Sequence, residues 1–287
     1  MEAVYEKEQI ADKYKSAITP ELVEKAYLQV RNKSFDNLSA ANQPVIKIIS
    51  GPCGMGKTTM TNLYMEQNHN YVWLNSDSFR YVLDETIFSG EISRKHPDLL
   101  SGIFSDLARD LRERLGKEAL NQNFNIILDC TLIKKEICQN LLTPALNQGY
   151  QISPLFLTGD ILTSLARTFN RYARQLADQG FGLLINPQWQ KEVHKLFLED
   201  TENFLINIPV CDINIISKDQ QQLHFSASET QIAIQTIKNH CLAPLTPNQK
   251  NDLELIWQNS FELLQKTKVP EEIKKIFEQT YQEFLQS

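Results

Sequence analysis

The sequence has no excess of basic residues, because 29 lysines and arginines stand against 35 aspartates and glutamates. The net charge of −6 and the pI near 5.5 argue against a general nucleic-acid-binding protein, since such surfaces neutralise phosphates with a basic excess. A local basic pocket is still compatible with this charge.

Patterned cysteines and long apolar runs are also missing. No run approaches the roughly 18 apolar residues that cross a bilayer, and the charged start MEAVYEKEQI lacks the apolar segment of a signal peptide. The five cysteines are odd in number and never form a Cys-x-x-Cys pair, which argues against a disulfide framework or a zinc site. We therefore expect a cytoplasmic protein without a membrane span, and delivery into another cell by a machine that reads other signals stays open.

The order of apolar patterns predicts an α/β fold. From residue 44 onward, short apolar runs alternate with helical patterns, which is typical of a mainly parallel sheet with helices on both faces. The predicted strands are 45–50, 71–75, 124–129, 151–157 and 211–216. The predicted helices are 57–68, 98–122, 134–147, 160–178 and 187–206.

Helical extensions are expected on both sides of this core. Residues 1–43 form a helical lead-in packed on the core, in which Thr19 caps a helix that begins at Pro20. Residues 44–240 are expected to form the core, with a flap at about 167–190 whose segment QGFGLLINP carries two glycines and a proline. Residues 241–287 carry two amphipathic patterns and predict a C-terminal helical hairpin.

One motif carries a specific chemistry. The run GPCGMGKT follows the strand VIKIIS and opens a helix, so it meets the Walker A pattern Gly-x-x-x-x-Gly-Lys-[Ser/Thr] in the right context. Backbone N–H groups of such a loop point at phosphates, and the following helix adds its positive N-terminal dipole. We expect ATP to be bound by nine consecutive residues, namely Gly51, Pro52, Cys53, Gly54, Met55, Gly56, Lys57, Thr58 and Thr59.

The motif predicts that the α/β fold is of the P-loop NTPase type and that residues 44–240 are a P-loop kinase-like core. Two residues of the motif have particular roles. Lys57 is expected to reach the β and γ phosphates, and the Thr58 hydroxyl is expected to ligate Mg²⁺. The alternative is a glycine-rich turn that meets the pattern by chance, and the flanking strand and helix argue against it.

Two aspartates follow predicted strands, where ligands bind in doubly wound sheets. Asp77 lies in the run NSDSFR after the strand YVWLN, and Asp129 ends the apolar run IILD as a Walker B acid does. One of them can hold Mg²⁺ and the other can accept the proton of an attacking hydroxyl, and spacing alone does not assign the two roles. The alternative for Asp77 is a helix N-cap or a turn residue.

Arginines on one predicted helix complete the pattern. Arg167, Arg171 and Arg174 are spaced four and three apart in ARTFNRYARQ, which places them on one helical face next to the flap. Kinases of this architecture bring lid arginines to the transferred phosphoryl group. A solvated basic surface is the alternative for the same spacing.

Over residues 44–218 the sequence resembles the zeta toxin family, P-loop kinases of bacterial toxin–antitoxin systems that phosphorylate the 3′-hydroxyl of UDP-N-acetylglucosamine and related UDP-amino sugars. The resemblance makes Asp77, in the family's Asp-x-Phe-[Lys/Arg] segment with Arg80, the counterpart of the catalytic base. It makes Asp129 and Thr131 counterparts of sugar-nucleotide-binding residues. It implies Arg171 as the phosphate-contacting arginine, and it implies an antitoxin or another protein as a partner.

Other positions relate less directly to the family pattern. Glu113 lies at the spacing of a further substrate-binding acid, and Arg174 is expected near the substrate. A second lid arginine of the family falls near Leu184, where Arg174 or Arg167 can substitute. The arginine expected after Thr131 is Ile133 here, with Lys134 as its substitute, and Asp129 is shorter than the glutamate usual in the family.

The leading hypothesis is therefore an ATP- and Mg²⁺-dependent kinase that phosphorylates a hydroxyl of a small molecule, with a UDP-amino sugar as the implied acceptor. Two alternatives remain. One is a nucleotide-binding pseudokinase or scaffold that acts through a protein partner, for which Leu184 is the main support. The other is a kinase of nucleic-acid ends, which the acidic charge disfavours. No histidine is assigned a role.

Overall fold

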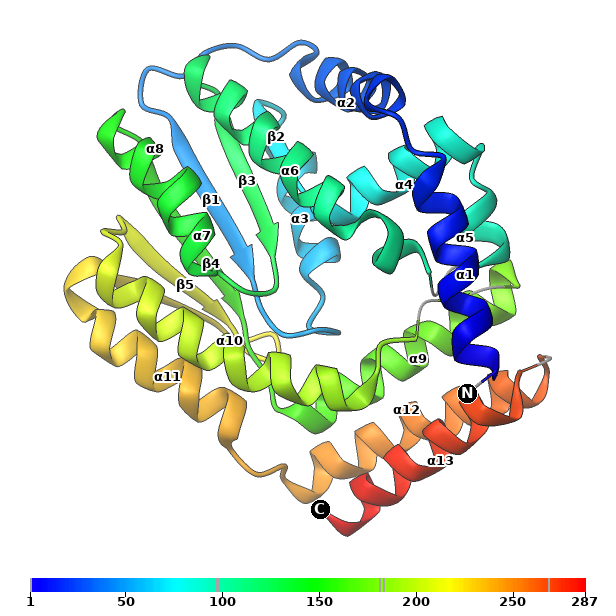
Figure 1. Cartoon of the computed structure of the whole chain (residues 1–287). Coiled ribbons are helices and arrows are strands. Elements are labelled where there is room, and N and C mark those ends of the chain that lie inside the picture. The colour runs from blue at the N-terminus through cyan, green and yellow to red at the C-terminus, as the bar shows by residue number, and fades with distance from the viewer. Residues whose placement is uncertain (1, 97–98, 181, 183, 268) are drawn as a thin grey trace. The chain divides into compact units, whose positions relative to one another are not determined.

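The computed structural model describes residues 2–96, 99–180, 182, 184–267 and 269–287 (Figure 1). The chain divides into two compact units, one of Met1–Val45 with Asn68–Leu128 and the other of Ile46–Gln67 with Asp129–Ser287. The strands form a six-stranded sheet in the order β2-β3-β1-β4-β5-β6. The α/β class is confirmed, and the predicted partition into lead-in, core and hairpin stays a prediction.

The first unit is mainly helical around two parallel strands. Strands β2 and β3 pair from Tyr71 opposite Asn125 to Leu74 opposite Leu128. Around them, α2 packs on α4, and α4 packs on α6. The elements are α1 (Glu2–Ser16), α2 (Pro20–Phe35), β2 (Tyr71–Leu74), α4 (Ser76–Phe88), α5 (Glu91–Lys95), α6 (Leu100–Asn121) and β3 (Asn125–Cys130), whose last two residues belong to the second unit.

Helix α2 begins as predicted. The Thr19 hydroxyl accepts a hydrogen bond from the Leu22 N–H, and Pro20 occupies the first turn.

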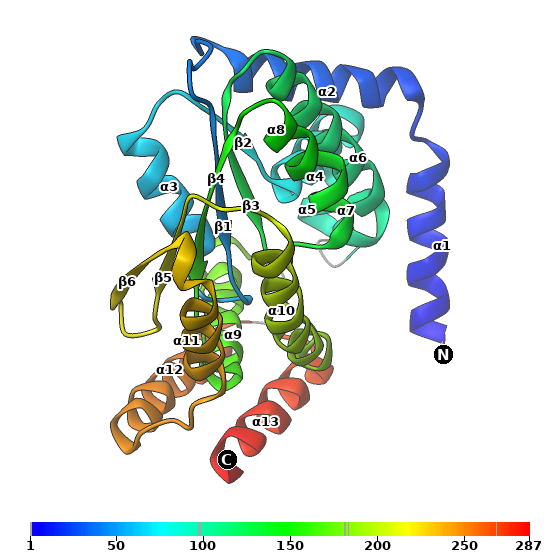
Figure 2. The same cartoon turned by 90° about the vertical axis from the view of Figure 1, so that its left-hand side faces the viewer.

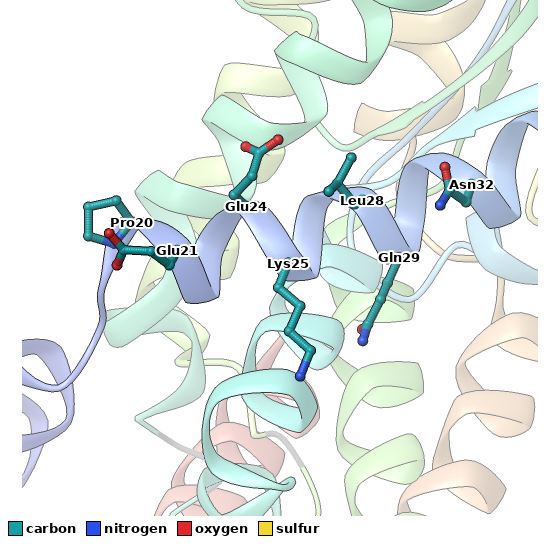
Figure 3. Close-up of a pocket in the computed structure, with 7 residues that line it drawn as sticks. All are labelled: Pro20, Glu21, Glu24, Lys25, Leu28, Gln29 and Asn32. Atoms are coloured by element: carbon teal, nitrogen blue, oxygen red, sulfur yellow. The ribbon is translucent and has the colours of Figure 1, made fainter.

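One side of α2 lines an open hollow of about 790 Å³ (Figure 3). Its lining contains none of the predicted site residues and consists of Pro20, Glu21, Glu24, Lys25, Leu28, Gln29 and Asn32.

Helices α4 and α5 were not predicted. The side chain of Asn75 caps α4 by accepting hydrogen bonds from the N–H groups of Asp77 and Ser78. Phe79 and Leu83, four positions apart, are buried on the same face. An asparagine cap followed by this spacing was therefore the local signal for α4.

The second unit holds the other strands. Strands β4 and β5 are parallel, and β6 is antiparallel to β5 at the edge. Helix α3 lies on one face of these strands, and α8 and α10 lie on the other (Figure 2). Apart from the C-terminal helices, the elements are β1 (Val45–Ser50), which starts in the first unit, α3 (Lys57–Gln67), α7 (Lys135–Ile137), α8 (Thr143–Asn147), β4 (Gln151–Leu157), α9 (Ile161–Gln179), α10 (Pro187–Asn207), β5 (Asp212–Ile216), β6 (Gln222–Ser226) and α11 (Thr230–Leu242).

The predicted strands agree with the structure to within one residue at each end, whereas three details differ. The predicted helix 134–147 contains a π-helical turn over Cys138–Leu142. This turn directly precedes Pro144, whose missing N–H cannot continue the α-helical ladder. Strand β6 and helix α11 were not predicted, and β6 carries only the weak alternation of an edge strand.

The residues of the predicted C-terminal hairpin form the helices α12 (Pro247–Gln265) and α13 (Glu271–Gln286). Its apolar side chains pack on α9, with the Phe169 ring centroid 4.4 Å from that of Phe277 and 5.1 Å from that of Trp257. The apolar stripes of the hairpin therefore belong to the core of the second unit. None of the helices in the described ranges is long and apolar enough to cross a membrane.

Candidate functional site

The glycine-rich loop between β1 and α3 is closely packed by its neighbours. A Cβ atom at Gly51 would lie 2.4 Å from the carbonyl oxygen of Leu157, at the end of β4. Gly54 has φ +73°, and a Cβ atom there would lie 2.9 Å from the Ser164 carbonyl oxygen on α9. Gly51 is required because its neighbour leaves no room for a side chain. Gly54 is required for the same reason and because its positive φ favours glycine.

Lys57 folds back over this loop at the start of α3. Its ammonium donates hydrogen bonds to the carbonyl oxygens of Gly51 at 2.7 Å and Pro52 at 2.9 Å. Burial lowers the pKa of Lys57, against the opposing influence of Cys53 and Asp129, and the positive charge of Arg171 lowers it further. An anion bound by the loop would give the Lys57 ammonium an oppositely charged partner in place of these neutral carbonyl oxygens.

Thr58 and Asp129 provide oxygen atoms beside the loop. Thr58 is exposed in the first turn of α3. One turn later, the buried Thr61 hydroxyl donates to Oδ2 of Asp129 at 3.4 Å, which connects α3 to the end of β3. A hydroxyl and a carboxylate suit Mg²⁺, which is held by few protein ligands together with substrate phosphates. No group of three or more His, Cys, Asp or Glu that could hold a metal occurs in the described residues.

Thr131 and Ile133 follow Asp129. The Thr131 carbonyl oxygen accepts a hydrogen bond from the Ser50 hydroxyl at 3.2 Å, so this segment is attached to the end of β1. Ile133 is buried, with 3% of its surface exposed, whereas Lys134 is exposed. The apolar residue at position 133 therefore has a packing role.

The three arginines of α9 differ in their surroundings. Arg171 and Arg174 are exposed, and Arg167 is partly buried, with its guanidinium donating to the Lys218 carbonyl oxygen at 3.4 Å. Leu184 packs against the apolar cluster of α9, α12 and α13, which explains an apolar residue there. Within the predicted flap, Phe181 and Leu183 lie outside the described residues.

An ion pair that sequence reasoning missed fixes the start of α9. Asp160 caps the helix by accepting from the Thr163 N–H at 2.9 Å, and it pairs with the Lys218 ammonium at 2.8 Å. Burial raises the pKa of Asp160, but the hydrogen bonds from Lys218 and Thr163 outweigh burial and leave this pKa below its ordinary value. An aspartate directly before an amphipathic helix was the available signal.

The first unit holds the other predicted site residues. Asp77 lies in the first turn of α4 with 71% of its side chain exposed, and Oδ1 accepts from Arg80 Nη1 at 2.5 Å. Asn75 is the N-cap, so the capping alternative for Asp77 is wrong. The Nε atom of Arg80 is buried and has no hydrogen-bond partner among the described residues. Glu113 is partly buried on α6, which packs on α4.

Comparisons with solved structures show the same fold in proteins of low identity. A structure from the PezAT chromosomal toxin–antitoxin system of Streptococcus pneumoniae has a TM-score of 0.70 and 18% identity, over 86% of this chain and 98% of that one. The AvrRxo1-ORF1:-ORF2 structure with ATP has a TM-score of 0.59 and 14% identity, over 91% and 89%. The corresponding structure with sulphate ions has a TM-score of 0.57 and 13% identity, over 86% and 84%.

Sequence comparison adds the family. None of the curated proteins matches the sequence. The family model described as zeta toxin matches residues 29–230, which include the loop, Asp77, Asp129 and Arg171. This match spans most of the chain and agrees with the predicted resemblance. The chain therefore belongs to the zeta toxin family and has the fold of a P-loop kinase-type phosphotransferase.

Proposed function

We propose that this protein is a kinase that transfers the γ-phosphate of ATP to a hydroxyl group of a small molecule, with a UDP-amino sugar as the first acceptor to test. The observation that carries the proposal is the arrangement in the second unit, where Lys57 folds over a tightly packed glycine-rich loop and Asp129 at the end of β3 accepts a hydrogen bond from Thr61 of α3. Binding of a nucleoside triphosphate needs a phosphate-binding loop, its lysine and a nearby acid together.

The loop and the start of α3 would hold the phosphates of ATP. Backbone N–H groups of the loop between Pro52 and Lys57 and the positive end of α3 would provide the anion site, and Lys57 would add a positive charge. The similarity in fold to a structure that contains ATP supports this choice of nucleotide. Thr58 and Asp129 would hold Mg²⁺, which supplies charge neutralisation on the phosphates when it is bound.

Catalysis would then depend on charge and on a base. Lys57 and Arg171 would stabilise the charge on the transferred phosphoryl group, and the exposed Arg174 would contact substrate. Asp77 would accept the proton of the acceptor hydroxyl, which leaves the metal role to Asp129. This assignment is supported by the solvent-exposed carboxylate of Asp77 and by the hydrogen bond from Thr61 on α3 to the buried Asp129.

Acceptor recognition is the finer part of the proposal. Arg80, Glu113, Asp129 and Thr131 are the residues that would contact the acceptor, as the family resemblance implies. The donor atoms of Arg80 suit a phosphate or carboxylate group, and its buried Nε has no protein partner among the described residues. A nucleoside diphosphate sugar offers such phosphates together with free hydroxyls.

The test is transfer of labelled γ-phosphate from ATP with Mg²⁺ to a panel of UDP-sugars, other metabolites and oligonucleotides. We expect label on one acceptor, and its loss in Lys57→Ala and in Asp77→Asn. The matched control for Asp77 is Asp106→Asn, because Asp106 forms a similar exposed pair with Arg109 three residues later on α6. Equal loss in both aspartate variants would show that Asp77 has no special role.

The same panel separates the alternatives. ATP binding that Lys57→Ala abolishes, without label on any acceptor, would favour a nucleotide-dependent binding protein over a kinase. Label on an oligonucleotide would favour a kinase of nucleic-acid ends. An antitoxin is the proposed protein partner, and its support is the fold similarity to a protein from a toxin–antitoxin system.

A further inference from the structure

A buried chain of polar side chains connects the glycine-rich loop to α9 and α10. Ser164 Oγ on α9 donates to the carbonyl oxygen of Cys53 at 2.7 Å. Gln190 Nε2 on α10 donates to Ser164 Oγ at 2.7 Å, and Thr168 Oγ1 donates to Gln190 Oε1 at 3.0 Å. Ser164, Gln190 and Thr168 are all at most 2% exposed.

The direction of the two bonds at Ser164 follows from the chemistry of its hydroxyl group. A serine hydroxyl has one hydrogen to donate and two lone pairs that accept. Because the amide of Gln190 donates to Ser164 Oγ, it occupies a lone pair and leaves the hydroxyl hydrogen for the Cys53 carbonyl oxygen. The carboxamide of Gln190 donates to Ser164 through Nε2 and accepts from Thr168 through Oε1.

The bond to Cys53 also fixes the next backbone amide. In a planar trans peptide the carbonyl and the following N–H point in opposite directions. The Cys53 carbonyl oxygen is directed at α9, so the N–H of Gly54 is directed away from α9. Gly54 itself is in close contact with α9, since a Cβ atom there would lie 2.9 Å from the Ser164 carbonyl oxygen and 3.2 Å from Arg167 Cβ.

We propose that Ser164 and Gln190 are positioning residues, which hold the Cys53–Gly54 peptide so that the Gly54 N–H points at the nucleotide phosphates. The proposal rests on the proposed function, because it requires phosphates in the glycine-rich loop. Neither residue touches the nucleotide, and both act through the loop backbone. Gln190 lies in the first turn of α10, so the starts of α9 and α10 and the loop share one hydrogen-bonded unit.

A second contact strengthens the attachment of α10 at this place. His194, one turn after Gln190, is 2.9 Å through Nε2 from the carbonyl oxygen of Gly159, just before α9. A Cβ atom at Gly159 would lie 2.7 Å from the sulfur of Met55 in the loop. Gln190 and His194, four residues apart on α10, therefore bind Ser164 and the Gly159 carbonyl oxygen, which belong to the segment 159–164 that lies against the loop.

The experiment is calorimetric titration of the whole protein with MgATP. Ser164→Ala should raise Kd about tenfold through misplacement of one phosphate-binding amide. Gln190→Glu should raise Kd about as much, since a carboxylate only accepts and would take the Ser164 hydrogen from Cys53. Gln190→Leu should raise Kd only about threefold, because Ser164 keeps its hydrogen for Cys53.

Stoichiometry and a matched control distinguish positioning from general structural damage. Ser260 is also fully buried, accepts from Asn170 Nδ2 at 3.0 Å and connects α12 to α9 away from the loop. Ser260→Ala should lower the melting temperature while leaving Kd unchanged. A variant that merely loses folded protein lowers the number of sites and keeps Kd, so raised Kd with unchanged stoichiometry supports the proposal.

Two results would overturn it. The first is that the wild type binds MgATP and both variants, Ser164→Ala and Gln190→Glu, bind it with the wild-type Kd. In that case the two residues do not position the loop, and the proposed nucleotide site stands without them. The second concerns the wild type alone. If the wild type does not bind MgATP, the proposed function fails and the positioning role fails with it.

Discussion

Truncation of Trp257 tests whether the C-terminal hairpin belongs to the core of the second unit. Trp257 is fully buried on α12. Its ring centroid lies 5.1 Å from that of Phe169 of α9, and 6.4 Å and 6.5 Å from those of Phe277 and Phe284 of α13. Replacing a buried tryptophan by alanine removes these contacts and leaves a cavity, at a cost of about 3–5 kcal/mol. The corresponding fall in melting temperature is roughly 6–20 °C for a unit of this size.

A second variant separates packing from the polar edge of the indole. The Nε1 atom of Trp257 is buried without a hydrogen-bond partner among the described residues. Trp257→Phe removes this unpaired donor together with part of the ring. We expect its cost to be below about 2 kcal/mol, because the loss of ring volume is offset by the loss of an unsatisfied N–H.

Thermal unfolding followed by circular dichroism measures both effects. Leu255→Ala is the matched control, because Leu255 lies two residues away on α12 and is 63% exposed, so its cost should be below about 0.5 kcal/mol. If Trp257→Ala lowers the melting temperature no more than this control, the hairpin is not part of the cooperative core and the reasoning is refuted.

Three further predictions concern single contacts. Burial lowers the pKa of His194 below its ordinary 6.5, so the unfolded chain binds the proton first and the free energy of unfolding should fall as the pH drops below about 6.5. Urea unfolding at a series of pH values should show that this free energy depends less steeply on pH in His194→Gln, and an equal dependence on pH contradicts the prediction. Thr58→Ala should raise the Mg²⁺ concentration needed for phosphate transfer by about tenfold or more, whereas Thr58→Ser should not; equal requirements in a Mg²⁺ titration exclude Thr58 as a ligand. Asp160→Asn should cost about 3–5 kcal/mol in thermal unfolding because it leaves the Lys218 ammonium unpaired, and an unchanged melting temperature counts against this ion pair.

The features predicted correctly from the sequence are those with local signals. The loop was predictable because glycine spacing and the flanking strand and helix are all contained in one short segment, and the Thr19 cap of α2 was predictable for the same reason. The strands were recognised by apolar runs of strand length. Helix α4 carries an equally local signal in Asn75, whose side chain caps the helix.

Other features depend on contacts between distant segments and could not be predicted. Nothing near Leu184 in the sequence indicates that it packs with side chains of α12 and α13. Gln190 resembles any polar residue of a first helical turn until its contact with Ser164 is seen. The roles of Asp77, Asp129 and Arg171 in particular stay predictions, because they concern atoms of a substrate.

The packing of α13 on α9 also has a consequence for synthesis of the protein. Helix α9 leaves the ribosome well before α13, since α10, β5, β6, α11 and α12 lie between them in the sequence. Until α13 has emerged, the aromatic side of α9 around Phe169 has no complete cover, and the nascent chain exposes an apolar surface. The growing chain should therefore be a chaperone client at this stage, and the helix that carries Arg171 gains its final support only when translation has passed Phe284.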